Sequence, residues 1–389
     1  MVVRLDRQHE RLGQEGPNMA QAGLNMSRRI RRTPYTDRVE AHGVRGFSVV
    51  NHMLLPKAFQ PDVQDDYFHL RSNVQIWDVA VQRQVQITGQ DAARLVQMMT
   101  PRDIRAAVTG QCLYLPLIDQ NAGMLNDPVL LKLGEESFWL SVADSDILLW
   151  ASGIAVGNGL NVAVEEPDVS PLAIQGPKAE ALMTSLFGPE ITALGHFRFG
   201  IFDVLGTRQL IARSGYSKQG GFEIYLQDGA LGSALWDLIW DAGADYDIRP
   251  GCPNLIERIE GGLMSYGNEF TRDNNPLECG FGPLCHLGDD VDYIGKAALC
   301  KLAERGPQRL LRGLKFGGGP TPPCGKPFPV TCDDGRVVGQ ITSGIYSPRL
   351  GCNVGMSMVE KSHWDFGTRL YVHTPDRAVR DATVEPFPF

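Results

Sequence analysis

The sequence predicts an α+β protein of several domains that ends in a small all-β domain. The chain has 389 residues, which is more than a single domain usually contains. Up to about residue 306, short apolar runs with strand character alternate with segments of helical period. From residue 307 onward the helical period is lost, the segment 317–329 is dense in glycine and proline, and Asp334-Gly335 is a hairpin signal.

The individual elements follow from local patterns. Apolar runs bounded by turn residues predict strands at 76–80, 81–87, 113–119, 129–133, 138–142 and 172–176. Helical spacing of apolar residues, with proline or glycine at the ends, predicts helices at 89–101, 144–157, 177–188, 230–242, 254–265 and 295–304. Strands and helices are thus mixed along the first 306 residues.

Composition and charge exclude several classes of protein. The net charge of −8 and the pI near 5.5 argue against a nucleic-acid-binding protein, which needs a basic surface. No apolar run approaches the ~20 residues of a membrane span. The eight cysteines form no CxxC pair and the eight histidines no HExxH pair, so we expect no metal site and reduced thiols in the cytoplasm. Residues 1–27 are polar, and we expect a disordered extension rather than a targeting peptide.

The segment 213–225 indicates a binding site. Glycines bend the backbone, and the strand that follows points Glu223 and Tyr225 to the same face. A carboxylate beside an aromatic ring suits a flat heterocycle with N–H donors, because the carboxylate accepts from the ring nitrogens and the aromatic ring covers one face. Half-buried strands without a function also carry such pairs, so the interpretation depends on other segments.

Five segments, in order, resemble motifs of the glycine-cleavage T-protein family of folate-dependent transferases: 76–80, 120–127, 172–177, 213–225 and 258–268. The segments 292–296 and 339–348 fit as well, so the resemblance runs from about residue 30 to the end. It implies a three-domain, cloverleaf-like fold with folate in its centre. The first α+β domain would comprise 28–79 and 163–245, the second 80–162 and 246–306, and a β-barrel or jelly-roll domain 307–389.

The resemblance also implies roles for single residues. Asp127 would lie beside the reactive folate nitrogen as the catalytic residue; a turn residue before Pro128 is the alternative reading. Glu223 would bind the pterin ring, and Tyr216 would help to wall it. Gln82 stands where the family lines the folate pocket with methionine. Tetrahydrofolate would be the co-substrate.

Departures from the family pattern indicate one branch of it. Asn126 replaces an acid of the family motif, Gln219 replaces a glutamate, and the stretch at Asn254 lacks the arginine that contacts folate. Segments that are similar to the dimethylsulfoniopropionate demethylases are 32–35, 51–56, 77–83, 126–128 and 138–146. This resemblance implies methyl transfer from a sulfonium compound to tetrahydrofolate, with Ser141 and Tyr225 near the substrate.

Alternatives remain open at this level. The donor could instead be dimethylglycine, sarcosine or a lipoyl-bound aminomethyl group, and a non-enzymatic folate-binding protein is a further reading. Beside Tyr225, the rings of Phe197, Phe199 and Trp139 are candidates to hold a cationic substrate, or they are simply core residues. The expected partners are a small-molecule methyl donor and tetrahydrofolate. A homodimer is compatible with the sequence, which carries no direct signal for oligomeric state.

Overall fold

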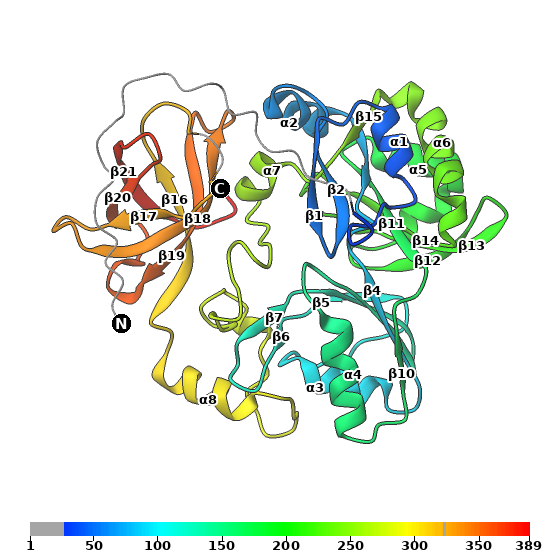
Figure 1. The fold of residues 1–389 in the computed structure, drawn as a ribbon, viewed down its shortest axis with the longest axis horizontal. Coiled ribbons are helices and arrows are strands. Elements are labelled where there is room, and N and C mark those ends of the chain that lie inside the picture. Colours follow the sequence, from blue (N-terminus) through cyan, green and yellow to red (C-terminus); the bar gives the residue numbers. More distant parts are fainter. Residues whose placement is uncertain (1–26, 322–323) are drawn as a thin grey trace.

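Three lobes lie around the middle of the molecule in the computed structural model, which describes residues 27–321 and 324–389 (Figure 1). Two lobes mix helices with sheets, and the third is a closed barrel of strands. The predicted α+β fold with a C-terminal barrel is therefore confirmed. The disordered extension expected at 1–27 lies outside the described residues except for Ser27.

The first lobe contains a six-stranded sheet whose strands come from distant parts of the chain. Its order is β12 (Phe199–Val204), β13 (Thr207–Ala212), β14 (Gly221–Gln227), β11 (Val169–Gln175), β3 (Val74–Asp78) and β15 (Ile248–Gly251). Only β15 and β3 pair in parallel. The helices that accompany this sheet are α1 (Thr36–Ala41), α5 (Ala179–Phe187) and α6 (Gly232–Ala242). The hairpin of β1 (Gly46–Val50) and β2 (Met53–Ala58) and helix α2 (Val63–Ser72) complete the lobe (Figure 1).

Alternate residues of β14 face two different cores, as the period of a strand requires. Phe222, Ile224 and Leu226 pack into the core under the helices of the first lobe. Tyr225 points the other way and packs with Trp139 of the second lobe. The face that carries Glu223 and Tyr225 is therefore the contact between the first two lobes.

The second lobe is built on a five-stranded sheet. Its order is β10 (Ala163–Glu165), β4 (Gln84–Thr88), β9 (Ser137–Ser141), β8 (Val129–Gly134) and β5 (Gln111–Tyr114). The core of this lobe includes the apolar faces of α3 (Ala92–Met99) and α4 (Ile147–Gly157). The small ladder of β6 (Leu117–Ile118) and β7 (Met124–Asn126) leads the chain into β8.

Sheet membership differs from the expected domain boundaries at two strands. β10 falls in the segment expected for the first domain, but it pairs with β4 of the second sheet. β15 falls in the segment expected for the second domain, but it pairs with β3 of the first sheet. The helix expected at 254–265 is also shorter: α7 spans Leu255–Glu260 and stops at two glycines, of which Gly262 has a φ of +63°. The released chain can then turn toward the centre of the molecule.

Helix α8 (Lys296–Arg305) leads into the C-terminal barrel (Figure 1). The barrel closes in the order β16 (Arg309–Phe316), β19 (Cys352–Glu360), β18 (Val337–Ser347), β17 (Phe328–Thr331), β20 (Arg369–His373) and β21 (Val379–Glu385). Its outer face packs on α2 and α7 through a shared apolar cluster. Within the described ranges, no helix combines the length and the hydropathy that crossing a membrane requires.

Candidate active site

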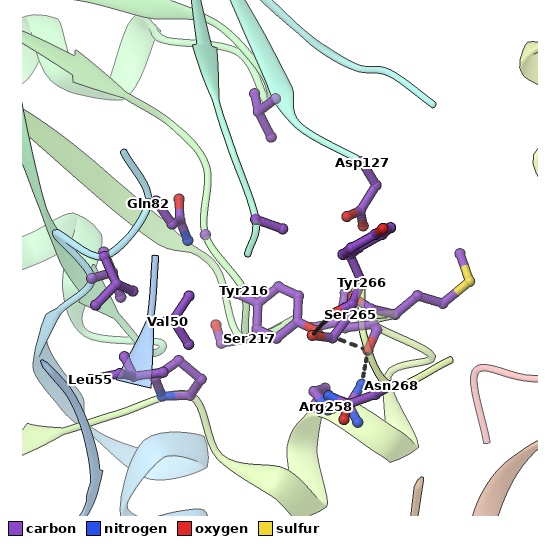
Figure 2. Close-up of a pocket in the computed structure, with 18 of the residues that line it drawn as sticks. Val50, Leu55, Gln82, Asp127, Tyr216, Ser217, Arg258, Ser265, Tyr266 and Asn268 are labelled. Carbon is purple, nitrogen blue, oxygen red and sulfur yellow. Dashed lines mark hydrogen bonds between the residues drawn. The ribbon is translucent and has the colours of Figure 1, made fainter. Parts of the chain in front are cut away.

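A cavity of about 1110 Å³ lies where the three lobes meet. Its wall includes Gln82 and Asp127 from the second lobe, Tyr216 from the first lobe and Ser343 from the barrel. In Figure 2, Asp127 lies at the upper right of this space, Leu55 at the lower left and the Tyr216 ring between them, with Gln82 at the upper left. A volume of this size accommodates an extended organic ligand together with a small second molecule.

Asp127 is positioned at the point where β7 ends and β8 is about to begin. Its side chain is buried, and Tyr114 Oη donates a 2.6 Å hydrogen bond to Oδ2. Oδ1 has no hydrogen-bond partner among the described residues. Burial raises the pKa of Asp127 to about 7, and the hydrogen bond from Tyr114 opposes that rise. An unpaired carboxylate oxygen with such a pKa is suited to accept a proton near neutral pH.

Asn126 fixes the backbone that carries Asp127. Its Nδ2 donates to the carbonyl of Ala143 at 3.1 Å and to Ser145 Oγ at 2.7 Å, while its Oδ1 accepts from the Ala143 N–H at 3.0 Å. A carboxylate could make only the accepting contact. The asparagine that departs from the family motif therefore has a structural reason in this chain.

Gln175, at the end of β11, holds the glycine-rich loop before β14. Its Nε2 donates to the Ser214 carbonyl at 3.1 Å, and its Oε1 accepts from Ser217 Oγ at 2.7 Å. Gly215 crosses this amide with a φ of +152°, and a Cβ there would lie 2.1 Å from Gln175 Nε2. Only glycine permits this approach. The contact between Gln175 and Gly215, which lie in two different sequence motifs, therefore shapes the loop that carries Tyr216.

The Tyr216 ring stands between two segments of the wall. Its hydroxyl donates to the carbonyls of Leu263 at 3.1 Å and Met264 at 2.7 Å (Figure 2). The ring is thus held at its outer end, and its faces line the cavity as expected for a residue that walls a flat ligand. The same 263–270 segment brings Tyr266 next to Asp127 (Figure 2).

A buried ion pair supports this segment from below. Arg258 Nη1 donates to Glu269 Oε2 at 2.7 Å, and Arg258 Nη2 donates to Ser343 Oγ at 2.5 Å. Ser343 in turn donates to Glu269. Helix α7, the 263–270 segment and barrel strand β18 are therefore joined at the floor of the cavity.

Gln82 and Ser141 lie together on the wall formed by the second lobe. Ser141 Oγ donates to Gln82 Oε1 at 3.3 Å and accepts from Gln84 Nε2 at 3.0 Å. Gln84 Nε2 also donates to the Gln82 carbonyl at 2.7 Å, which fixes the turn before β4. Both sequence-predicted residues therefore offer polar groups to the cavity.

Glu223 and Tyr225 lie directly behind the wall and do not line the cavity. The side chain of Ser214, which does line it, donates a hydrogen bond to the Glu223 carboxylate. Burial raises the pKa of Glu223, and the hydrogen bond from Ser214 opposes that rise. Tyr225 is only 1% exposed and packs against Trp139, with ring centroids 6.3 Å apart. The structure thus brings Asp127, Gln82, Ser141 and Tyr216 together and keeps these two behind them.

Among the other aromatic candidates, Phe197 lines the cavity. Trp139 and Phe199 belong to the core between the first two lobes, which agrees with their interpretation as core residues. Sequence reasoning missed Tyr114, the donor to Asp127, and Gln175, the clamp on the loop. Gln175 lies in the segment 172–177, which resembles a family motif. Tyr114 lies in no such segment, and only the pairing of β5 with β8 brings it close to Asp127.

The cavity fits a reduced folate. The Tyr216 ring offers a face for a flat heterocycle, and the orphaned oxygen of Asp127 offers an acceptor for an N–H group. The buried carboxylate of Glu223 lies one side chain behind this wall. A flat ring with several N–H donors is the ligand that this set of groups favours.

Comparisons with known proteins cover nearly the whole chain. The model of the GCVT N-terminal domain matches residues 35–289, and that of the glycine cleavage T-protein C-terminal barrel domain matches residues 309–389. Dimethylsulfoniopropionate demethylase DmdA of Ruegeria pomeroyi is 50% identical over 93% of this chain and 98% of that protein. The aminomethyltransferase of Bacillus subtilis is 30% identical over 92% of this chain and 99% of that protein. The structure of glycine cleavage system aminomethyltransferase T from Bartonella henselae shares the fold, with a TM-score of 0.82 at 23% identity over 92% of this chain and 98% of its own.

Proposed function

The chain belongs to the glycine cleavage T-protein family, and from this premise we propose that it demethylates dimethylsulfoniopropionate to methylmercaptopropionate with tetrahydrofolate as methyl acceptor. The observation that carries the proposal is the 50% identity to a dimethylsulfoniopropionate demethylase over 93% of the chain, against 30% to an aminomethyltransferase. The altered residues at Asn126 and Asn254 point the same way, because a carrier-dependent aminomethyltransferase would be expected to keep the family's charged groups there.

The chemistry asks little of the protein beyond alignment and charge control. A sulfonium methyl is already electrophilic, and tetrahydrofolate supplies the nitrogen nucleophile when bound. Asp127 stabilises the positive charge that develops on the nucleophile and takes up the surplus proton. The pKa of about 7 suits this role, because the carboxylate form is substantially present at neutral pH. Alignment of the two ligands supplies most of the acceleration.

The remaining wall residues orient the two ligands in this proposal. Tyr216 covers a face of the pterin ring, and Gln82 offers a polar contact to its edge. Ser141 turns its hydroxyl from Gln82 to the carboxylate of the sulfonium substrate. Phe197 provides an aromatic face for the cation, in the place expected for Tyr225, which the first two lobes enclose. Glu223 binds the pterin either through the Ser214 hydroxyl, which lies between them, or directly after the Ser214 side chain moves aside.

The folate product distinguishes the possible methyl donors from one another. Purified protein is incubated with tetrahydrofolate and, separately, dimethylsulfoniopropionate, dimethylglycine, sarcosine or an aminomethyl-lipoyl carrier, and the folate product is identified by mass spectrometry. We expect 5-methyltetrahydrofolate with dimethylsulfoniopropionate only. Formation of 5,10-methylenetetrahydrofolate from an amine donor would instead make the chain an aminomethyltransferase, and folate binding without any turnover would make it a non-enzymatic binding protein.

Replacement of the catalytic carboxylate is the sharpest test of the site. Asp127→Ala should lower the methyl-transfer rate by about a hundredfold or more, the scale of losing one preorganised polar group. Folate affinity, measured by calorimetry, should change only a few-fold. Asp289→Ala, which removes an exposed carboxylate outside the cavity, serves as the control. If the variant kept a rate within a few-fold of the wild-type rate, Asp127 would not lie at the reaction centre.

We also propose a cytoplasmic location and a homodimer. All eight cysteines are free, which suits a reducing compartment. Helix α4 exposes Leu149 to 67% and Val156 to 83%, and an apolar helix face of this kind supports contact with a second copy. Sedimentation of the wild type and of Val156→Glu would separate a dimer from a monomer.

A further inference from the structure

The tip of the β1–β2 hairpin reaches from the first lobe to the second (Figure 1). The chain turns there through Asn51 and His52, whose φ values of 50° and 62° lie in the left-handed region. Asparagine tolerates this region better than most residues do, which suits Asn51 to the turn. The turn does not explain why Asn51 is buried while its neighbour His52 is exposed.

The Asn51 side chain is directed into the second lobe. Its Nδ2 group donates to the carbonyls of Val81 at 2.9 Å, Ala143 at 3.1 Å and Val142 at 3.4 Å. Its backbone N–H donates to Asp144 Oδ1 at 2.7 Å. One residue of the first lobe is therefore bonded to two segments of the second lobe that line the cavity, namely the turn before β4 and the chain that follows β9.

Ala143 links this contact to the catalytic carboxylate. Its carbonyl accepts from Asn51 Nδ2 and from Asn126 Nδ2, each at 3.1 Å, and its N–H donates to Asn126 Oδ1 at 3.0 Å. The same Oδ1 accepts from the Asp127 N–H at 3.0 Å. A continuous path of hydrogen bonds of ordinary length therefore leads from Asn51 to the backbone of Asp127.

We propose that Asn51 is a positioning residue for methyl transfer, which fixes Asp127 relative to the folate nitrogen. This inference rests on the proposed function. Tyr216, which covers the pterin, belongs to the first lobe, whereas Asp127 belongs to the second, so their separation depends on how the two lobes are aligned. Asn51 is carried by the first lobe and holds the second through Ala143. Misplacement of a reacting group by about 1 Å can lower the rate about a hundredfold.

Asn51→Gly is the test variant, because glycine keeps the left-handed turn and removes only the amide. We expect kcat for methyl transfer to fall about tenfold or more. The folate Kd, measured by calorimetry, should change less than about threefold, because the carbonyls of Leu263 and Met264 still hold Tyr216. His52→Gly makes the same backbone change at the adjacent exposed position and should keep the wild-type values.

Two further variants ask whether Asn51 acts through Asp127. In the Asp127→Ala background, Asn51→Gly should lower the remaining rate less than about threefold, because a residue that places another has no effect once the other is gone. Asn51→Ser keeps a hydroxyl donor on the same backbone, and its kcat should lie between those of the wild type and Asn51→Gly. It also provides the measurement if Asn51→Gly is poorly folded in urea unfolding.

Two results would overturn the proposal. One is a wild-type kcat in both Asn51→Gly and Asn51→Ser. The other is an undiminished loss of rate in the Asp127→Ala background, which would show that Asn51 contributes only to the fold. Absence of methyl transfer from dimethylsulfoniopropionate by the wild type would instead contradict the proposed function. The same comparison with the donor that the chain does use would then test Asn51, because its contacts are all made within the protein.

Discussion

Asp127 is under two opposing influences whose balance sets its working pH. Burial away from water favours the protonated acid, and the Tyr114 hydroxyl favours the carboxylate by donating to it. The carboxylate must be free of its proton to accept another. Methyl transfer should therefore rise as pH increases through about 7 and level off above it.

Removal of the Tyr114 hydroxyl should move that rise to higher pH. Tyr114→Phe takes away a donor that stabilises the charged form, so the pKa of Asp127 increases, and the acid limb of kcat/KM should shift upward by about one pH unit. The measurement is the pH–rate profile between pH 5.5 and 9. Tyr371→Phe, which breaks a tyrosine–aspartate hydrogen bond to Asp333 on the barrel, should leave the profile in place. A shift toward lower pH would show that the Tyr114 hydroxyl does not stabilise the carboxylate, whereas a rate that falls through pH 7 would show that the protonated acid is the active form.

At the same scale, the sequence allowed some site residues to be predicted and not others. Asp127, Gln82, Ser141 and Tyr216 line the cavity because the motifs that contain them border on turns, and turn residues face the junction between lobes. The shared face of Glu223 and Tyr225 followed from the strand period. The strand period does not tell which sheet covers that face, because this depends on the packing of the second lobe against β14.

The loop 214–221 is the element on which ligand geometry depends most. Two of its glycines, Gly215 and Gly221, have large positive φ values. The Gln175 side chain occupies the space that a Cβ at either position would need. The loop has no regular backbone pairing of its own, so side-chain contacts replace it. The orientation of Tyr216 is therefore set by an amide on a neighbouring strand.

Gln175→Leu tests this dependence. The change keeps the volume but leaves the Ser214 carbonyl and Ser217 hydroxyl without a buried partner, which should cost about 1–3 kcal/mol of unfolding free energy. Folate affinity should fall about tenfold as the loop loses its clamp. Urea unfolding and calorimetry provide the two readouts. Gln209→Leu removes a similar buried glutamine clamp on β13 and should lower stability without lowering affinity; equal losses of affinity in both variants would point to a general effect.

Element types were also easier to predict than element limits. Helix α3 was foreseen from its apolar spacing, and four of its side chains are buried as expected. Helix α7 was expected to be longer because the residues after it remain apolar, but two consecutive glycines end it. β10 and β15 pair with strands outside the domains expected for their segments, because short strands carry no sequence mark of their pairing partner.

Across the whole molecule, the barrel is joined to the rest by polar contacts inside an apolar interface. Glu260 accepts from Tyr67 Oη at 2.9 Å, from Ser347 Oγ at 2.5 Å and from Arg349 Nε at 2.8 Å. Arg258 and Glu269 form the second connection through Ser343. Since the barrel supplies part of the cavity wall, its attachment is also part of the site.

Breaking the second connection should loosen the barrel. Arg258→Met leaves Glu269 buried without its partner and should cost about 3–5 kcal/mol, whereas Arg258→Met/Glu269→Leu, which removes both charges, should cost clearly less. Equilibrium unfolding in urea measures both. Arg336→Met, which breaks an exposed pair with Glu360 on the barrel, should change the free energy of unfolding far less than Arg258→Met does. Additive losses in the double variant would show that the two residues act independently.

The position of β3 in its sheet has a consequence for synthesis of the protein. This strand pairs on one side with residues 172–175 and on the other with residues 248–251. At translation rates of about 5–20 residues per second, the second neighbour emerges on the order of ten seconds or more after the strand itself. Throughout that interval, at least one hydrogen-bonding edge of this strand stays open and must be shielded, and a chain that ends before residue 248 would keep that edge exposed and be prone to aggregation.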